Sequence, residues 1–307
     1  MSYSASASPS SGEQIAAVGD LELCYETFGD RSDPALVLIM GLATQMIAWR
    51  EEFCESLAAA GFFVVRFDNR DVGRSTTLDG LPVPTTWQLL KRDKRAASYT
   101  LEDMALDVVG LLDHLEIERA HVVGASMGAM IAQTVAAKHP DRVLSLVSIM
   151  GSTGARTSGQ PQLRTAKVLL AVPPKDRDGF VEHMVKTFTI IGSPGFERDE
   201  DELRRFAETT FDRGRNPAAS ARQLAAINAS GNRTPLLRQI SAPTLVIHGE
   251  ADTLVRPSGG RATAKAIAGS TLLEIPGMGH DLPPEAVVPQ AGCNHGAIQR
   301  IMQEATR

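Results

Sequence analysis

The stretch His121-Val122-Val123-Gly124-Ala125-Ser126-Met127-Gly128-Ala129-Met130-Ile131 decides the fold of this chain. It begins as a short apolar strand, passes through Gly-x-Ser-x-Gly and continues as a helix of small and apolar residues. In that setting the serine stands on a sharp turn with its hydroxyl exposed. Gly124 and Gly128 carry no Cβ, so the strand and the helix can cross at close range. The stretch therefore predicts a nucleophile at the end of a central strand.

Composition limits the classes of protein that this chain can belong to. Its 307 residues suffice for one large α/β domain with an insertion or for two modest domains, and a net charge of -5 argues against a nucleic-acid-binding surface. Cys24, Cys54 and Cys293 are odd in number and far apart, which fits neither a disulfide framework nor metal-ligand spacing and favours the reducing cytoplasm. The Ser/Ala-rich residues 1–14 predict a disordered tail rather than a signal peptide, and no run is long enough for a membrane span.

Strands and helices alternate through the first half of the chain. Residues 15–18 and 21–28 predict an edge hairpin. Residues 35–40 are apolar throughout, which is typical of a strand buried on both faces, and residues 62–67 predict a second buried strand. A helix is expected from about Trp49 to Gly61, and another begins at Thr100, with Asp103 three residues later. Residues 79–98, with two prolines and a basic cluster, predict an excursion over the surface. The alternation predicts an α/β fold with a mostly parallel sheet and helices on both faces.

The second half contains an insertion. A strand at 143–150 is followed up to Gln239 only by helical patterns, at 163–170, 180–190, 202–211 and 218–229. Strand signals resume at 243–249 and 271–275, with a helix at 257–267 between them. We therefore expect a core domain made of residues 15–150 and 240–307, and a helical cap made of residues 151–239. Insertions at the carboxyl end of a strand lie over the ligand-binding edge of such a sheet.

A serine hydroxyl is a weak nucleophile and needs a base that a third group holds in the right tautomer. His280 follows the last strand in a glycine-rich loop, whereas the other histidines lie in or at the ends of predicted elements or in the irregular tail. Asp252 follows the strand at 243–249 by a few residues and reaches the same sheet edge. Glu250 and Asp281 are rival carboxylates. We expect Ser126, Asp252 and His280 to form a catalytic triad.

Five segments together resemble the α/β-hydrolase fold family over nearly the whole chain: Gly41 after its strand, the loop 68–75, Gly124 to Gly128, Gly249 to Asp252, and Gly277 to His280. The order Ser, Asp, His is also the order of that family. More narrowly, Asp-x-Arg-Asp-x-Gly-Arg-Ser-Thr at 68–76 and Ile-Pro-Gly-Met-Gly-His at 275–280 resemble the esterase branch of aclacinomycin methylesterase. The resemblance implies a carboxylic ester hydrolase with a helical cap.

Two segments depart from the family pattern. Met40-Gly41 replaces the frequent His-Gly, as it also does in that esterase branch. The position implies that the backbone N–H groups of Leu42 and Met127 form the oxyanion hole, and a backbone donor needs no particular side chain. After Asp281, prolines and Gly292 interrupt the expected closing helix, so regular helix is expected only at about 297–305.

The expected reaction is a two-step acyl transfer through Ser126, with no cofactor and no metal. The expected partner is a small-molecule substrate, a neutral and apolar ester of small to medium size, because the cap helices are rich in apolar residues and no arginine cluster stands beside the catalytic loops. Dehalogenases and epoxide hydrolases of this fold use an aspartate at the elbow and are disfavoured. Carbon-carbon bond hydrolases, cofactor-free haloperoxidases with perhydrolase activity, and a non-catalytic ligand receptor remain alternatives. The sequence does not predict an oligomeric state.

Overall fold

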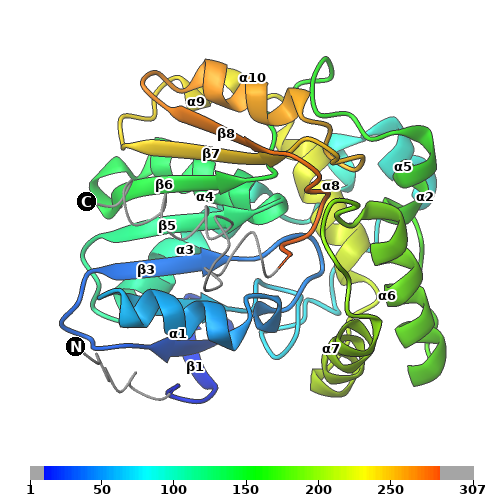
Figure 1. The fold of residues 1–307 in the computed structure, drawn as a ribbon, viewed down its shortest axis with the longest axis horizontal. Coiled ribbons are helices and arrows are strands. Elements are labelled where there is room, and N and C mark those ends of the chain that lie inside the picture. Colours follow the sequence, from blue (N-terminus) through cyan, green and yellow to red (C-terminus); the bar gives the residue numbers. More distant parts are fainter. Residues whose placement is uncertain (1–9, 284–307) are drawn as a thin grey trace.

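The protein is described by a computed structural model of residues 10–283, which is organised around one twisted sheet (Figure 1). Within these residues eight strands lie in the order β1-β2-β4-β3-β5-β6-β7-β8. β2 pairs antiparallel with β1 and β4, and the remaining pairs are parallel. The strands are β1 Gln14–Val18, β2 Leu21–Phe28, β3 Ala35–Ile39, β4 Phe63–Phe67, β5 Ala120–Ala125, β6 Val143–Ile149, β7 Thr244–Gly249 and β8 Thr271–Ile275. The mostly parallel sheet with an antiparallel edge confirms the predicted fold class.

Helices cover both faces of the sheet and enclose two apolar clusters. α1 (Glu51–Ala59) packs Phe53 and Leu57 on one face. α3 (Leu101–His114) and α4 (Met127–Lys138) pack on the other face, with Leu237 of α9 (Thr234–Leu237) and Ala266 of α10 (Ser258–Ala266) in the same cluster. β3 and β5 lie between the two clusters and are buried along their whole length, as expected for central parallel strands.

Short polar signals explain where two helices begin. Thr100 and Asp103 form a capping box, each side chain bonding the other's backbone N–H, and α3 starts at the next residue as predicted. Thr85 and Gln88 form a second capping box at the start of α2 (Thr86–Lys91). This helix lies within the segment 79–98 that was predicted only as a surface excursion. The Thr-x-x-Gln spacing is the signal that identifies it.

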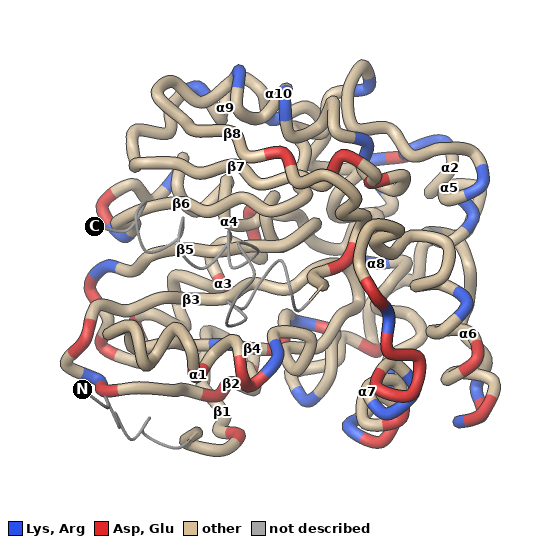
Figure 2. Tube along the Cα trace, in the orientation of Figure 1, with Lys and Arg blue, Asp and Glu red and all other residues tan. Residues whose placement is uncertain are grey.

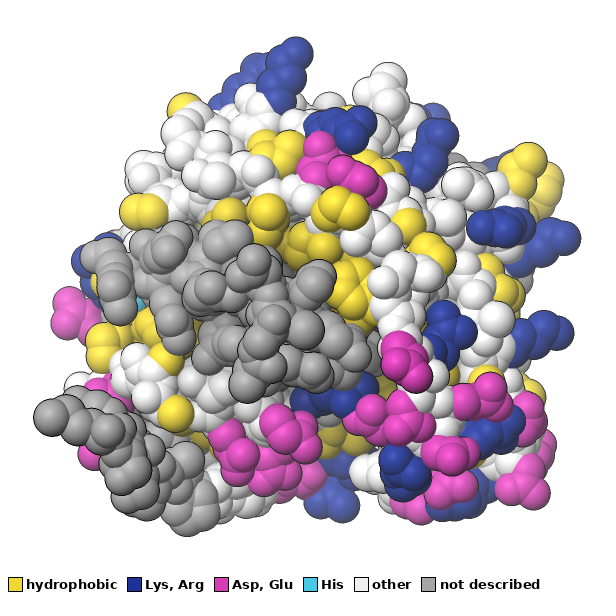
Figure 3. All heavy atoms as spheres, in the orientation of Figure 1, with side chains coloured by type: hydrophobic (Ala, Val, Ile, Leu, Met, Phe, Trp, Pro, Cys, Tyr) yellow, Lys and Arg dark blue, Asp and Glu magenta, His cyan; other side chains and the backbone are white. Residues whose placement is uncertain are grey.

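Four longer helices lie between β6 and β7, and the described residues of this interval contain no strand. They are α5 (Leu163–Leu169), α6 (Arg177–Ile191), α7 (Glu200–Arg213) and α8 (Ala219–Ser230), and they stand beyond the carboxyl ends of the parallel strands (Figure 1). Charged side chains of both signs gather over α7 (Figures 2 and 3), where Arg204 pairs with Glu182 and Glu200. We call residues 151–239 the cap.

Two predicted segments fall largely outside the described residues. The helix expected at about 297–305 and Cys293 lie entirely outside them, as do residues 1–9 of the expected tail. The chain is already ordered at Ser11, because its amide donates to the Thr27 carbonyl, and Gln14 begins β1. Over residues 10–283, no helix combines the length and apolarity needed to cross a bilayer.

Candidate active site

Ser126 stands at the turn between β5 and α4. Its φ of 57° and ψ of -116° are strained for a residue with a side chain. Its amide donates to the Ile149 carbonyl at 2.9 Å, which ties the turn to β6. A Cβ added at Gly124 would lie 2.2 Å from the Gly128 carbonyl oxygen, so the strand and the helix cross where only glycine fits. The turn presents the serine hydroxyl at the carboxyl edge of the sheet.

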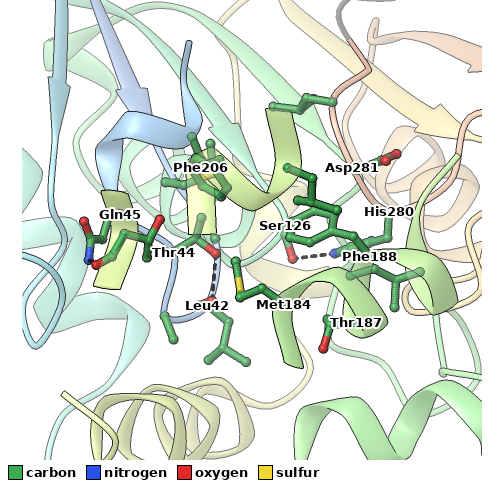
Figure 4. A pocket seen from close by; sticks show the side chains of 18 of the residues that line it. Leu42, Thr44, Gln45, Ser126, Met184, Thr187, Phe188, Phe206, His280 and Asp281 are labelled. Atoms are coloured by element: carbon green, nitrogen blue, oxygen red, sulfur yellow. Dashed lines mark hydrogen bonds between the residues drawn. The ribbon is translucent and has the colours of Figure 1, made fainter. Parts of the chain in front are cut away.

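His280 lies in the loop after β8 and faces this hydroxyl. Its Nε2 is 2.9 Å from the Ser126 Oγ (Figure 4). The cap holds the backbone of this loop, since the His280 amide donates to the Ile191 carbonyl at 2.7 Å and the Gly279 amide donates to the Ser193 Oγ at 2.8 Å. His280 is buried, and hydrogen bonds fix both its backbone amide and its ring Nε2.

Asp252, in the loop after β7, completes a chain of hydrogen bonds. Its Oδ2 lies 2.7 Å from the His280 Nδ1, and its Oδ1 accepts from the amides of Leu254 at 2.8 Å and Val255 at 2.9 Å. Burial raises the pKa of Asp252, but His280 and His248 beside it outweigh burial and hold that pKa well below its usual range. The carboxylate is therefore ionised and oriented by the main chain.

The structure separates Asp252 from its two rivals. The Glu250 side chain is exposed, and the Asp281 carboxylate accepts from the amide and hydroxyl of Ser193 instead of from a histidine. His248, which was not among the predicted site residues, also contacts Asp252: its Nε2 donates to the Val255 carbonyl at 2.7 Å and lies 3.5 Å from the Asp252 Oδ2. Its position four residues before Asp252, at the end of a buried strand, is the only signal of this contact in the sequence.

The two residues expected to form the oxyanion hole, Leu42 and Met127, belong to segments next to the serine. Met127 is the first residue of α4, where the N–H groups have no carbonyl partner within the helix. Leu42 follows Gly41, and a Cβ added at Gly41 would lie 3.1 Å from the Ser126 Cβ. The close approach of Gly41 brings the loop after β3 alongside the nucleophile.

A cavity of about 930 Å³ opens over Ser126 and His280. The core and the cap both supply its apolar wall; in Figure 4 Met184 and Phe188 lie beside the reactive pair, and Phe206 lies on the side of Thr44 and Gln45. The larger apolar side chains that the cap contributes include Phe180, Met184, Phe188, Ile191, Phe196 and Phe206. This volume lies near the upper end of the range for small-molecule sites.

Two buried ion pairs hold the cap on the core. Neither was predicted from the sequence. Arg222 of α8 makes two bonds to Asp71, at 2.8 and 2.7 Å, with both side chains fully buried. Arg213 of α7 lies 2.9 Å from Asp68. Because the partners are 151 and 145 residues apart, no local pattern indicates either pair.

Comparisons with known proteins identify the fold. A family model described as alpha/beta hydrolase fold matches residues 34–287. Among curated proteins, the rhodomycin D methylesterase of Streptomyces sp. is 29% identical, over 90% of this chain and 95% of its own length. The 3-oxoadipate enol-lactonase 2 of Acinetobacter baylyi is 27% identical, over 92% of this chain and 94% of its own length. Among solved structures, the enol-lactonase from Burkholderia xenovorans aligns with a TM-score of 0.63 at 25% identity, over 87% of this chain and 92% of its own.

Proposed function

This chain belongs to the α/β-hydrolase fold family, and on that premise we propose that it is a serine-dependent carboxylic ester hydrolase. The observation that carries the proposal is the chain of hydrogen bonds from Ser126 through His280 to Asp252 beneath the cavity. The names of the similar proteins support cleavage of a carboxylic ester bond, since a methylesterase and an enol-lactonase are both named for that reaction.

In the proposed first half-reaction the Ser126 Oγ attacks the ester carbonyl carbon while the His280 Nε2 takes the serine proton. Asp252 holds the proton on the His280 Nδ1 and stabilises the imidazolium that forms. The carbonyl oxygen becomes an oxyanion and accepts hydrogen bonds from the N–H groups of Leu42 and Met127. The tetrahedral intermediate then collapses, the C–O bond to the alcohol breaks, and His280 returns the proton to the leaving alkoxide.

The second half-reaction releases the acid. Water, which loses its proton to His280, adds to the carbonyl of the acyl-Ser126 ester and forms a second oxyanion. Collapse of this intermediate breaks the bond to the Ser126 Oγ, which recovers its proton from His280. The products are an alcohol and a carboxylic acid, and the enzyme returns to its starting state.

The proposed substrate is a neutral, apolar ester of small to medium size. Aromatic and aliphatic side chains of the cap, among them Met184 and Phe188, line the cavity. The two arginines of the loop 68–75 are already paired, Arg70 with Asp107 and Arg74 with Glu13. Three arginines line the cavity: Arg50 pairs with Glu202, Arg198 donates to the Thr189 hydroxyl, and the Arg215 guanidinium lies over the rings of Phe180 and Phe211. We also propose a cytoplasmic location, since Cys24 and Cys54 are buried free thiols.

A series of p-nitrophenyl esters tests the proposal, with Ser126→Ala as the inactive control. We expect kcat/KM to rise from acetate to butyrate or hexanoate, because each buried methylene adds about 0.8 kcal/mol, nearly fourfold, to transition-state binding. It should fall for palmitate, which exceeds a bounded cavity. Acetate as the fastest substrate would contradict the apolar acyl pocket, and preference for a free carboxylate would implicate Arg198 or Arg215. A ligand receptor would leave every ester intact.

A further inference from the structure

The loop that carries the Leu42 N–H is held from outside the core. We call residues 41–46 the oxyanion loop. Within it Ala43 has a φ of 51°, in the left-handed region that a residue with a side chain rarely adopts. The Ala43 amide donates to the Gln223 Oε1 of α8 at 2.7 Å, and the Leu42 carbonyl accepts from the Thr44 Oγ1 at 3.0 Å. Both polar atoms of the peptide between Leu42 and Ala43 are thus fixed, directly beside the N–H of Leu42.

Gln223 is itself held in a single orientation. Its side chain is fully buried, and its Nε2 donates to the Arg70 carbonyl at 3.0 Å, which leaves the Oε1 to face Ala43. Its neighbour Arg222 makes the two buried bonds to Asp71 that seat α8 on the core. The amide of Gln223 therefore bridges two core loops from a cap helix.

A second glutamine connects the same loop to α7. The Gln45 Nε2 donates to the carbonyls of Thr210 at 2.9 Å and Gly214 at 2.8 Å, at the end of that helix. Its Oε1 accepts from Arg213 at 2.7 Å. The oxyanion loop thus contacts two cap helices through buried and part-buried hydrogen bonds, and Figure 4 shows Leu42, Thr44 and Gln45 on one side of the cavity.

We propose that Gln223 is a positioning residue that holds the Leu42 N–H in place for the oxyanion, so that seating of α8 and assembly of the oxyanion hole are one event. The inference rests on the proposed function. Without the Gln223 acceptor, the half-buried Ala43 N–H would lose its hydrogen bond, and the left-handed conformation would lose the contact that stabilises it. Ala43 would then relax to another φ, and the shift of the loop would move the neighbouring N–H of Leu42.

Gln223→Met tests this proposal, because it keeps the side-chain volume and removes both hydrogen-bonding groups. We expect kcat for p-nitrophenyl butyrate to fall about 10- to 100-fold with KM nearly unchanged. Asn228→Leu is the matched control. It removes a side-chain amide of the same helix, whose Nδ2 donates a hydrogen bond to the Leu89 carbonyl at 3.2 Å, and it leaves the oxyanion loop unchanged. That variant should retain the wild-type kcat.

An inhibitor pair separates positioning from a general loss of packing. An alkyl trifluoromethyl ketone accepts the Ser126 Oγ at its carbonyl carbon, the serine proton passes to His280, and the ketone oxygen becomes an oxyanion. The matching methyl ketone binds without that addition. Gln223→Met should weaken the trifluoromethyl ketone by the same factor as kcat and leave the methyl ketone unchanged. Equal weakening of both ketones would overturn the proposal.

Gln223→Glu provides a second variant with a pH signature. Its ionised carboxylate would set an oxygen against the Arg70 carbonyl, whereas the protonated acid restores both hydrogen bonds. The ratio of its kcat to that of the wild type should therefore rise as the pH falls, and a ratio independent of pH would count against the proposal. If Gln223→Met does not fold, the pH dependence of Gln223→Glu tests the proposal in its place.

Hydrogen exchange tests the inference independently of activity. Peptides covering residues 41–46 should exchange faster in Gln223→Met than in the wild type or Asn228→Leu. If the wild type hydrolyses no ester, the proposed function fails while exchange still reports on the loop. Unchanged exchange together with unchanged kcat would show that the core alone holds the Leu42 N–H.

Discussion

Replacing Asp252 by asparagine should reverse one hydrogen bond of the triad. The Oδ1 of Asp252 accepts from two backbone amides, those of Leu254 and Val255, so the asparagine carbonyl must take that place. The asparagine NH₂ then takes the place of the Oδ2 and points at the His280 Nδ1. As an acceptor of that bond, Nδ1 gives up its proton to Nε2, which faces Ser126 as a donor. The ring can then no longer take the serine proton.

The magnitude follows from the lost tautomer. The corresponding change in a serine protease lowers kcat by about 10⁴, and we expect a loss of about 10³ to 10⁴ for Asp252→Asn, or about 4 to 5.5 kcal/mol of transition-state stabilisation. KM should change little, because the aspartate makes no contact with the ester in the proposed mechanism. The fold should survive, since the two main-chain bonds to the Oδ1 position remain.

Steady-state hydrolysis of p-nitrophenyl butyrate measures this loss, with a thermal melt to verify the fold. Glu250→Gln is the control, because it makes the same carboxylate-to-amide change two residues away on an exposed side chain. It should retain most of the wild-type kcat. A loss smaller than about tenfold in Asp252→Asn, or an equal loss in both variants, would refute the assignment of the triad carboxylate.

Gly124→Ala should destabilise the fold by at least about 3 kcal/mol, because its Cβ would lie 2.2 Å from the Gly128 carbonyl oxygen. Gly80→Ala, with nothing within 4 Å, is the control, and equal urea midpoints would contradict the crowding. Burial lowers the pKa of His121 to about 4; with an unfolded pKa of about 6.5, the folded state loses stability as the pH falls from about 6.5 to about 4. As the pH falls through that window, the Tm of His121→Phe should therefore rise relative to the Tm of the wild type. A Tm difference that stays constant with pH would disprove this linkage. Phe188→Ala should lower kcat/KM for the hexanoate ester about tenfold more than for the acetate, and an unchanged ratio would make Phe188 a packing residue only.

Patterns confined to short segments were readable from the sequence. Gly-x-Ser-x-Gly between an apolar strand and a helix predicted the turn at Ser126, and Asp252 and His280 were placed by a simpler rule, that the carboxyl ends of parallel strands meet at one edge. The structure brings these three side chains together, and their catalytic roles remain predictions. The capping box of Thr85 and Gln88 was also a local pattern and was overlooked.

Contacts between the cap and the core could not be predicted from the sequence. Gln223 lies 180 residues from Ala43, whose amide donates to it. Nothing in the sequence around Gln223 distinguishes it from a polar residue on an exposed helix face. Arg222 has the same ambiguity, because an isolated arginine in a helix is usually solvated. Both become significant only when the insertion folds back over the sheet edge, which depends on the tertiary packing of the whole cap.

The contacts between the cap and the His280 loop limit how this enzyme can be redesigned. Gly277 and Gly195 are so close that a Cβ on Gly277 would lie 2.7 Å from the Gly195 Cα. The Ser193 hydroxyl accepts a hydrogen bond from the Gly279 amide. A chimera that received the cap of a relative would lose these contacts unless the graft carried a serine and a glycine at the same two places. Exchange of substrate pockets between such enzymes therefore requires a donor cap that also fits the loop of the recipient's histidine.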